Sequence, residues 1–110
     1  MIQTPVVLMD YCGTIADGTS ANTVGVPIIG LTMASGLIYS DRAVTLIMKQ
    51  GVSEHTGAFV YRHTRNIAIP AGECRAIEFP VFGKYCSLEI ANASGGLATV
   101  EVFFSIRKQE

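Results

Sequence analysis

The sequence is short of charged residues, and this shortage limits the partners that the protein can attract. Only 15% of its 110 residues are charged, against about 25% in an average soluble domain. So few charges cannot cover a folded monomer, and we therefore expect part of its surface to be buried against another chain. A formal net charge of −1 gives no long-range attraction to nucleic acid or to an anionic membrane, so we expect neither as a partner.

Groups of residues suited to catalysis or metal binding are also missing. Nucleophilic catalysis needs a nucleophile, a base and an orienting group held together. The segment Gly18-Thr19-Ser20-Ala21-Asn22 lacks the second glycine of a nucleophile elbow. The two histidines, His55 and His63, have no second ligand at a metal-binding spacing. We expect no enzymatic activity, no metal and no cofactor; the enzyme alternative, a cupin-like or hydrolytic pocket, would need more histidines.

The three cysteines and the N-terminal residues carry no sign of secretion or of membrane insertion. Cys12, Cys74 and Cys86 lack metal-ligand spacing and follow no secretory signal, so we expect reduced thiols. A bridge from Cys74 to Cys86 between neighbouring strands is the alternative. No basic leader precedes residues 6–9, and the uncharged stretch 18–40 is too polar and too interrupted for a membrane span. We expect assembly in the cytoplasm.

In the last third of the sequence, apolar and polar residues alternate with a period of two. Three runs alternate in this way, at residues 76–81, 85–90 and 99–106. Gly83-Lys84 and the glycine-rich segment 92–96 separate them as turns. This pattern is typical of antiparallel strands with one buried face. The sequence therefore predicts three strands joined by two closing hairpins.

Further strands are expected earlier in the chain. Residues 43–49 and 58–63 alternate in the same way, with a predicted turn at 51–54 between them and a Pro-Gly turn at 69–73 after them. The first 40 residues are expected to add short strands at Thr4–Met9, Gly25–Gly30 and Leu37–Tyr39. Seven to nine short strands without a helical stripe predict an all-β, single-domain antiparallel β-sandwich. We expect a jelly-roll-like form, with an immunoglobulin-like sandwich as the alternative.

The first 40 residues form an arm that is poor in charge. No Lys or Arg occurs before Arg42, and all eight basic residues of the chain lie from there onward. Disordered arms are usually charged and poor in aliphatic residues, so we expect this arm to be ordered as short strands and loops. Its strands either complete the same sandwich or dock in part on a neighbouring subunit.

Apolar residues on the predicted outer faces of strands indicate a contact surface. Tyr85 shares its face with Glu89, and Phe103 shares its face with Glu101. Adjacent strands would bring these two aromatic side chains onto one surface, where burying each would contribute about 1.5–3 kcal/mol. We therefore predict a homo-oligomer, in the form of a trimer. The predicted interface residues are Val26, Ile28, Ile29 and Leu31 of the arm together with Ile47, Tyr85 and Phe103.

A basic group with interleaved aromatic residues could hold single-stranded nucleic acid. It comprises Phe59, Tyr61, Arg62, His63 and Arg65, and aromatic side chains can stack bases while Arg pairs with phosphate. Strand alternation, however, places Tyr61 and Arg62 on opposite faces. We therefore expect a polar sheet edge or a salt-bridged interface here, and no nucleic-acid partner.

The order of turns and strands from Asp41 to Arg107 carries a family resemblance. A strand at 41–46 is followed by a polar loop and by an Ile-Pro-Ala-Gly turn at 69–72. A Pro80-Val81-x-Gly83-x-Tyr85 segment comes next, and then a strand that ends in Asn92-x-Ser94-Gly95-Gly96-x-Ala98. This order resembles that of small structural β-sandwich proteins of tailed-phage virions.

The resemblance implies a structural protein of the virion without enzymatic activity. The form it implies is a capsid decoration (cement) protein, or else a neck or tail accessory protein. Such a protein would oligomerise, bind the major capsid protein or another virion protein, and stabilise the shell because it binds only the assembled state. A carbohydrate-binding or host-adhesion module of a phage tail fibre or neck is the alternative function.

Overall fold

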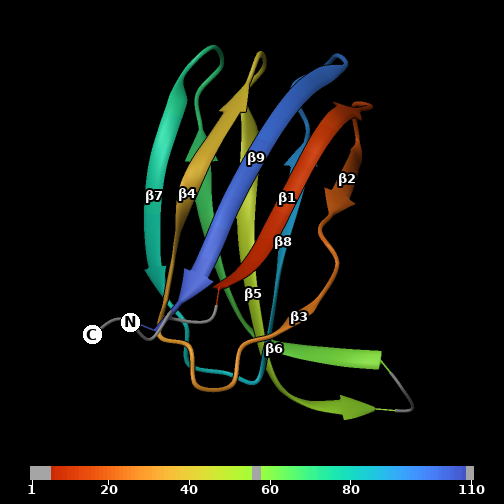
Figure 1. The fold of residues 1–110 in the computed structure, drawn as a ribbon. Coiled ribbons are helices and arrows are strands. Elements are labelled where there is room, and N and C mark those ends of the chain that lie inside the picture. The colour runs from red at the N-terminus through yellow and green to blue at the C-terminus, as the bar shows by residue number, and fades with distance from the viewer. Residues whose placement is uncertain (1–5, 56–57, 109–110) are drawn as a thin grey trace.

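The protein folds as two antiparallel β-sheets packed face to face (Figure 1). The structure is a computed structural model that describes residues 6–55 and 58–108. Sheet A contains, in spatial order, β1 (Val6–Ile15), β9 (Ala98–Arg107), β4 (Met33–Ser40) and β7 (Cys74–Pro80). Sheet B contains β2 (Thr19–Asn22), β8 (Tyr85–Asn92), β5 (Val44–His55) and β6 (Ala58–Ile69), and β3 (Val26–Pro27) also pairs with β8. The prediction of an all-β antiparallel sandwich is confirmed.

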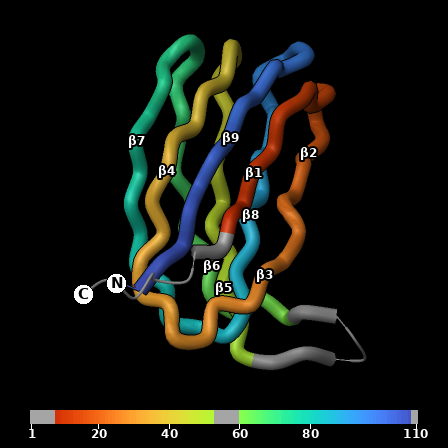
Figure 2. Tube along the Cα trace, in the orientation of Figure 1, coloured from red at the N-terminus to blue at the C-terminus, as the bar shows by residue number. Residues whose placement is uncertain are grey.

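The path of the chain between the two sheets is that of a jelly roll. β2 and β3 both pair with β8, as two halves of one interrupted edge strand. β5 and β6 form a hairpin within sheet B. All the remaining connections cross from one sheet to the other (Figure 2). This winding matches the jelly-roll-like form that the sequence predicts.

The core lies between the sheets and follows directly from the alternation in the sequence. Side chains along β9 are alternately buried and exposed over most of the strand, because successive residues point to opposite faces. Phe104, the largest fully buried side chain, packs its ring 5.9 Å from that of Phe79 on β7. Sheet B supplies the opposite wall with the buried side chains of Leu46, Met48, Leu88 and Ile90. The predicted inward faces of β5, β8 and β9 are confirmed.

The two predicted closing hairpins are wrong. β7, β8 and β9 follow one another along the chain, but β8 belongs to sheet B while β7 and β9 belong to sheet A. Alternation identifies the buried face of each strand, but both sheets bury that face against the same core. It therefore cannot tell which sheet a strand joins. As a consequence, Tyr85 and Phe103 lie on different sheets and not on one surface, as the sequence had suggested.

The predicted turn at residues 51–54 is also wrong, because β5 continues through it to His55. The pairing with β6 is irregular here, with register shifts on both sides of Gly51. A Cβ at Gly51 would collide with the carbonyl oxygen of Val60, so only glycine allows the two strands to approach this closely. The same glycine made the segment resemble a turn in the sequence.

The strands of the charge-poor arm are part of the two sheets. β1 and β4 flank β9, and β2 and β3 border β8. Of the two alternatives for the arm, the described residues follow the first, in which the arm completes the sandwich. β1 is longer than the predicted strand at Thr4–Met9, of which residues 4 and 5 lie outside the described residues, and β3 is shorter than the predicted strand at Gly25–Gly30.

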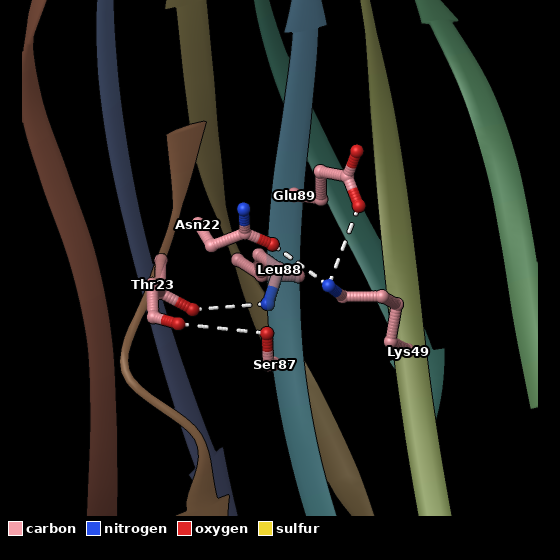
Figure 3. A network of polar contacts seen from close by, with 6 residues as sticks. All are labelled: Asn22, Thr23, Lys49, Ser87, Leu88 and Glu89. Atoms are coloured by element: carbon pink, nitrogen blue, oxygen red, sulfur yellow. Dashed lines mark hydrogen bonds and ion pairs between the residues drawn. The ribbon is translucent and has the colours of Figure 1, made fainter. Parts of the chain in front are cut away.

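A network of polar contacts holds the interrupted edge strand on β8 (Figure 3). Thr23 lies in the gap between β2 and β3; its backbone N–H donates to the Leu88 carbonyl at 2.8 Å, and its Oγ1 accepts from the Leu88 N–H at 2.9 Å. Lys49 Nζ donates to Asn22 Oδ1 at 2.7 Å and lies 3.3 Å from Glu89 Oε1. These contacts make the middle of the outer face of sheet B polar.

Candidate docking site

The residues predicted to form an interface are scattered over the molecule. Phe103 lies on sheet A, and Ile47 and Tyr85 lie half-buried on sheet B. In the arm, Ile29 is 71% exposed, and Val26 and Leu31 are half-buried against the core. The prediction that Ile28 lies in an interface is wrong, because its side chain is 1% exposed and belongs to the core. The reason is that the chain crosses between the sheets just after β3, and Ile28 closes the end of the core there.

Three exposed apolar side chains gather at one end of the sandwich, and we call Ile29, Val52 and Phe82 the end patch. They are 71%, 60% and 80% exposed, respectively. They come from the β3–β4 connection, from β5 and from the β7–β8 connection, which meet at the lower end in Figure 1. Together with Gly83 and Lys84 they line an open hollow of about 380 Å³. Scattered exposed apolar residues are ordinary, but a cluster marks a contact surface.

A second hollow shares Val52, Phe82 and Gly83 with the first and has a basic border. Its volume is about 220 Å³, and Val52, Phe82 and Gly83 line it together with Arg62 and His63. Arg62 and His63, two of the three basic residues predicted to form a polar sheet edge or a salt-bridged interface, therefore lie beside the end patch. Phe82 lines both hollows, the first of which also includes Lys84.

The buried side chain of Gln50 holds the loop that carries Phe82. Its Nε2 donates to the Pro80 carbonyl at 3.1 Å, and its Oε1 accepts from the N–H groups of Phe82 at 2.7 Å and Gly83 at 3.2 Å. The Lys84 N–H donates to the Gly51 carbonyl at 2.8 Å. Gly83 is required here, because a Cβ on it would lie only 2.6 Å from that same carbonyl oxygen. The backbone of the loop is thus fixed while the Phe82 ring faces solvent.

Such an arrangement is suited to binding another protein. A fixed loop loses little conformational freedom on binding, so more of the contact energy remains as affinity. Large aromatic side chains set in a pocket are also the residues that most often dominate the energy of an interface. The basic border of Arg62 and His63 complements an acidic border on a partner. Chemically, the end patch offers an aromatic anchor with apolar neighbours and with the basic side chains of Lys84, Arg62 and His63 around it.

In residues 6–55 and 58–108, no three His, Cys, Asp or Glu side chains come together as a metal site. The described part of the chain also contains no helix long and apolar enough to span a membrane.

The cysteines are unpaired within the chain, and they differ in accessibility. Cys12 on β1 and Cys74 on β7 are exposed, whereas Cys86 on β8 is buried. The alternative of a Cys74–Cys86 bridge is wrong, because both thiols are free, with Cys74 exposed and Cys86 buried in the core. Burial raises the pKa of the Cys86 thiol to about 12, and since the thiolate is the reactive form, Cys86 remains an unreactive thiol.

Phe82, Val52 and Gln50 are functional residues that were not predicted from the sequence. For Phe82 a signal existed, because a large aromatic residue stands inside the turn-forming segment Pro80–Gly83. For Gln50 the alternation after Met48 already placed position 50 on the buried face of β5. A buried amide side chain needs hydrogen-bond partners, so its role in holding a loop could have been suspected.

The fold and its geometry define the chain as a jelly-roll β-sandwich. No protein-family model matches it, and no curated protein matches it. A solved chain from Bacillus endospore appendages, described as a novel family of disulfide-linked pili, is similar to it. The two share 17% sequence identity and a TM-score of 0.55, and the similarity covers 98% of this chain and 92% of that chain. At this identity the similarity shows the fold alone.

Proposed function

We propose that the chain is a non-enzymatic structural subunit that associates with copies of itself in an ordered protein assembly. The observation that carries this proposal is the end patch, where Gln50 fixes a loop that exposes 80% of Phe82. Exposing an aromatic side chain to water is energetically unfavourable and gives a monomer no benefit. Held on a fixed backbone, the same side chain can be buried in an interface with another chain. The low charge content of 15% agrees with a surface that is partly covered by partners.

The specific form we propose is a capsid decoration protein of a tailed phage. The order of strands and turns from Asp41 to Arg107 supports this form, since it resembles small structural proteins of such virions. The protein would act in the virion as a homotrimer on the major capsid protein or on another virion protein. Because it would bind only the assembled shell, it would stabilise that shell by mass action.

Co-sedimentation with undecorated phage shells tests this form. We expect wild-type protein to pellet with shells, and to raise the temperature at which the shells release their contents. Phe82→Ser should bind more weakly, because it removes the aromatic anchor. Leu97→Ser is the matched control, since Leu97 is 59% exposed but follows the β8–β9 turn, at the other end of the sandwich. Wild-type protein that stays in the supernatant with every shell tested contradicts the capsid form.

A filament subunit is the second candidate function. The observation that favours it is the structure of sheet A, whose two outermost strands, β1 and β7, are open to a further strand within the described part of the chain. The similar solved chain comes from appendages described as pili, so a jelly roll of this size can serve in a fibre. Electron microscopy of concentrated protein decides between the two forms, because only the filament form gives fibres without a shell.

A further inference from the structure

The two exposed cysteines lie at opposite ends of one row across sheet A. Cys12 on β1 is paired with Glu101 on β9, Glu101 with Tyr39 on β4, and Tyr39 with Cys74 on β7. All four residues border the same open hollow of about 370 Å³ on the outer face of the sheet. Both thiols therefore point to the same side of the sheet, at the same level, from its two edges.

Within one chain these two cysteines cannot form a bond. Neighbouring strands lie about 4.8 Å apart, so three strand spacings separate the edges by about 14 Å. A disulfide needs Cα atoms about 4.4–6.8 Å apart. Cys12 and Cys74 can therefore reach a disulfide partner only on another molecule.

The direction of the strands allows one copy to continue the sheet of the next. Each neighbouring pair in the order β1, β9, β4, β7 is antiparallel, so β1 runs antiparallel to β7. In the front layer of Figure 1 these two strands form the opposite edges of the sheet. A second copy placed alongside in the same orientation would bring its β1 antiparallel to β7 of the first. Open strand edges of this kind are templates for a further strand.

The charges along the two edges select the same register as the cysteines. With Cys12 opposite Cys74, the next pairs across the contact are Tyr11 with Arg75, Asp10 with Ala76, and Leu8 with Glu78. Each charged residue of the two edges then meets an uncharged one, and Arg75 meets an aromatic ring. A shift by two residues would instead place Asp10 opposite Glu78, and directly opposed like charges are destabilising. A shift the other way would place the buried Met9 opposite Arg75.

We propose that Cys12 of one copy and Cys74 of the next form an intermolecular disulfide that joins β1 and β7 edge to edge and extends sheet A from copy to copy. The inference rests on the proposed function as a self-associating subunit, and it names the partner surface. Opposed residues of antiparallel strands have Cα atoms about 4.5–5.5 Å apart, within the range that a disulfide needs. The contact is head-to-tail, so it produces a ring if the rotation closes and a chain if it does not.

The bond forms by thiol–disulfide exchange with a small-molecule disulfide as the oxidant. The Cys12 thiol gives up its proton and its thiolate attacks one sulfur of the oxidant, which releases one small thiol. The Cys74 thiolate of the next copy then attacks the Cys12 sulfur and releases the second small thiol. Two protein thiols are oxidised by two electrons, and the oxidant is reduced to two thiols. The buried Cys86 takes no part.

Oxidation of complementary variants with oxidised glutathione tests the proposal. On non-reducing gels we expect wild type and Cys86→Ala to give covalent species larger than a dimer. Cys12→Ser and Cys74→Ser, each alone, should lose these species. An equal mixture of the two single variants should give a dimer, and mass spectrometry of its peptides should find Cys74 bonded to Cys12.

Three outcomes overturn the proposal. They are a wild type that yields only dimers or no linked species, single variants that still form larger species, and a mixture in which Cys12–Cys12 or Cys74–Cys74 links dominate. Light scattering of the double variant Cys12→Ser/Cys74→Ser in reductant separates this failure from failure of the proposed function. If the gel test fails and the double variant still associates, only the disulfide contact is overturned, whereas a strictly monomeric double variant overturns the proposed function as well.

Discussion

At the scale of single residues, Gln50 connects the core to the docking surface. Its backbone belongs to the regular part of β5, and its side chain reaches out of the core to hold the loop of residues 80–83. One amide group thus bonds to two N–H groups and one carbonyl of the loop in a partly buried place. The exposure of Phe82 is therefore a feature of a well-ordered loop.

Replacing this amide should loosen the loop. Gln50→Leu keeps the size of the side chain but leaves the N–H groups of Phe82 and Gly83 without their acceptor. We expect a loss of about 1–3 kcal/mol in the free energy of unfolding, measured by urea denaturation. Asn66→Leu is the control, since Asn66 is exposed on β6, and it should change stability by no more than about 0.5 kcal/mol. Equal effects of the two variants would mean that Gln50 does not hold the loop.

The buried thiol of Cys86 should make stability depend on alkaline pH. Its pKa is raised from the ordinary 9.0 to about 12 in the folded protein, so between these values the unfolded chain binds fewer protons than the folded one. Stability therefore falls as pH rises through this window, by up to about 1.4 kcal/mol per pH unit from this group. Cys86→Ala should flatten the slope measured by denaturant unfolding in reductant, whereas Cys12→Ser should leave it unchanged. An unaltered slope in Cys86→Ala contradicts this assignment.

At the scale of strands, the pair β4 and β9 forms the centre of sheet A. Gly36 on β4 lies against Phe103 and Phe104 of β9 so closely that no side chain fits. The adjacent Phe104 ring is fully buried and reaches Phe79 on β7. The close approach of these two strands therefore determines how Phe104 packs on the sheet A side of the core.

A methyl group at this position should force the two strands apart. Gly36→Ala would place its Cβ against backbone atoms of Phe103 and Phe104, which cannot move as a side-chain tip can. We expect destabilisation of about 1–3 kcal/mol, read from thermal unfolding. Gly13→Ala on the edge strand β1 is the matched control, because its nearest neighbours are atoms of the Tyr11 ring, which can rotate away. A melting temperature equally lowered in both variants would show that close approach is not what Gly36 provides.

Prediction from sequence succeeded where a single strand carries its own signal. The inward faces of β5, β8 and β9 follow from alternation, and the turn at residues 69–73 follows from its Pro and Gly. It failed where the answer depends on two strands at once. Assigning β8 to sheet B needs knowledge of its partners β2 and β5, and the irregular pairing at Gly51 needs knowledge of Val60.

The candidate docking site was predicted only in part for the same reason. Ile29 was named from sequence, and it does lie in the end patch. Val52 and Phe82 join it from segments 23 and 53 positions further along the chain, and only the closed sandwich brings them together. Cys12 and Cys74 likewise become the two ends of one row only because β9 and β4 lie between their strands.

At the scale of the whole molecule, the two proposed contacts point in different directions. The end patch lies at one end of the sandwich, whereas β1 and β7 lie along its sides, as the trace in Figure 2 shows. A subunit with a single self-complementary surface stops at a closed pair. Contacts in two directions allow a ring to dock on a shell, or a fibre to gain lateral support.

Association through the end patch is the central claim about how this protein works. Sedimentation velocity in reductant, which removes any disulfide, measures this association directly for wild type, Phe82→Ser and the control Leu97→Ser. A central aromatic residue contributes about 2 kcal/mol or more to an interface, so its loss should weaken association by about 30-fold. We predict that wild type and Leu97→Ser sediment as oligomers at micromolar concentration, while Phe82→Ser sediments as a folded monomer. A wild type that is itself monomeric there, or a Phe82→Ser variant that sediments as wild type does, would contradict the account.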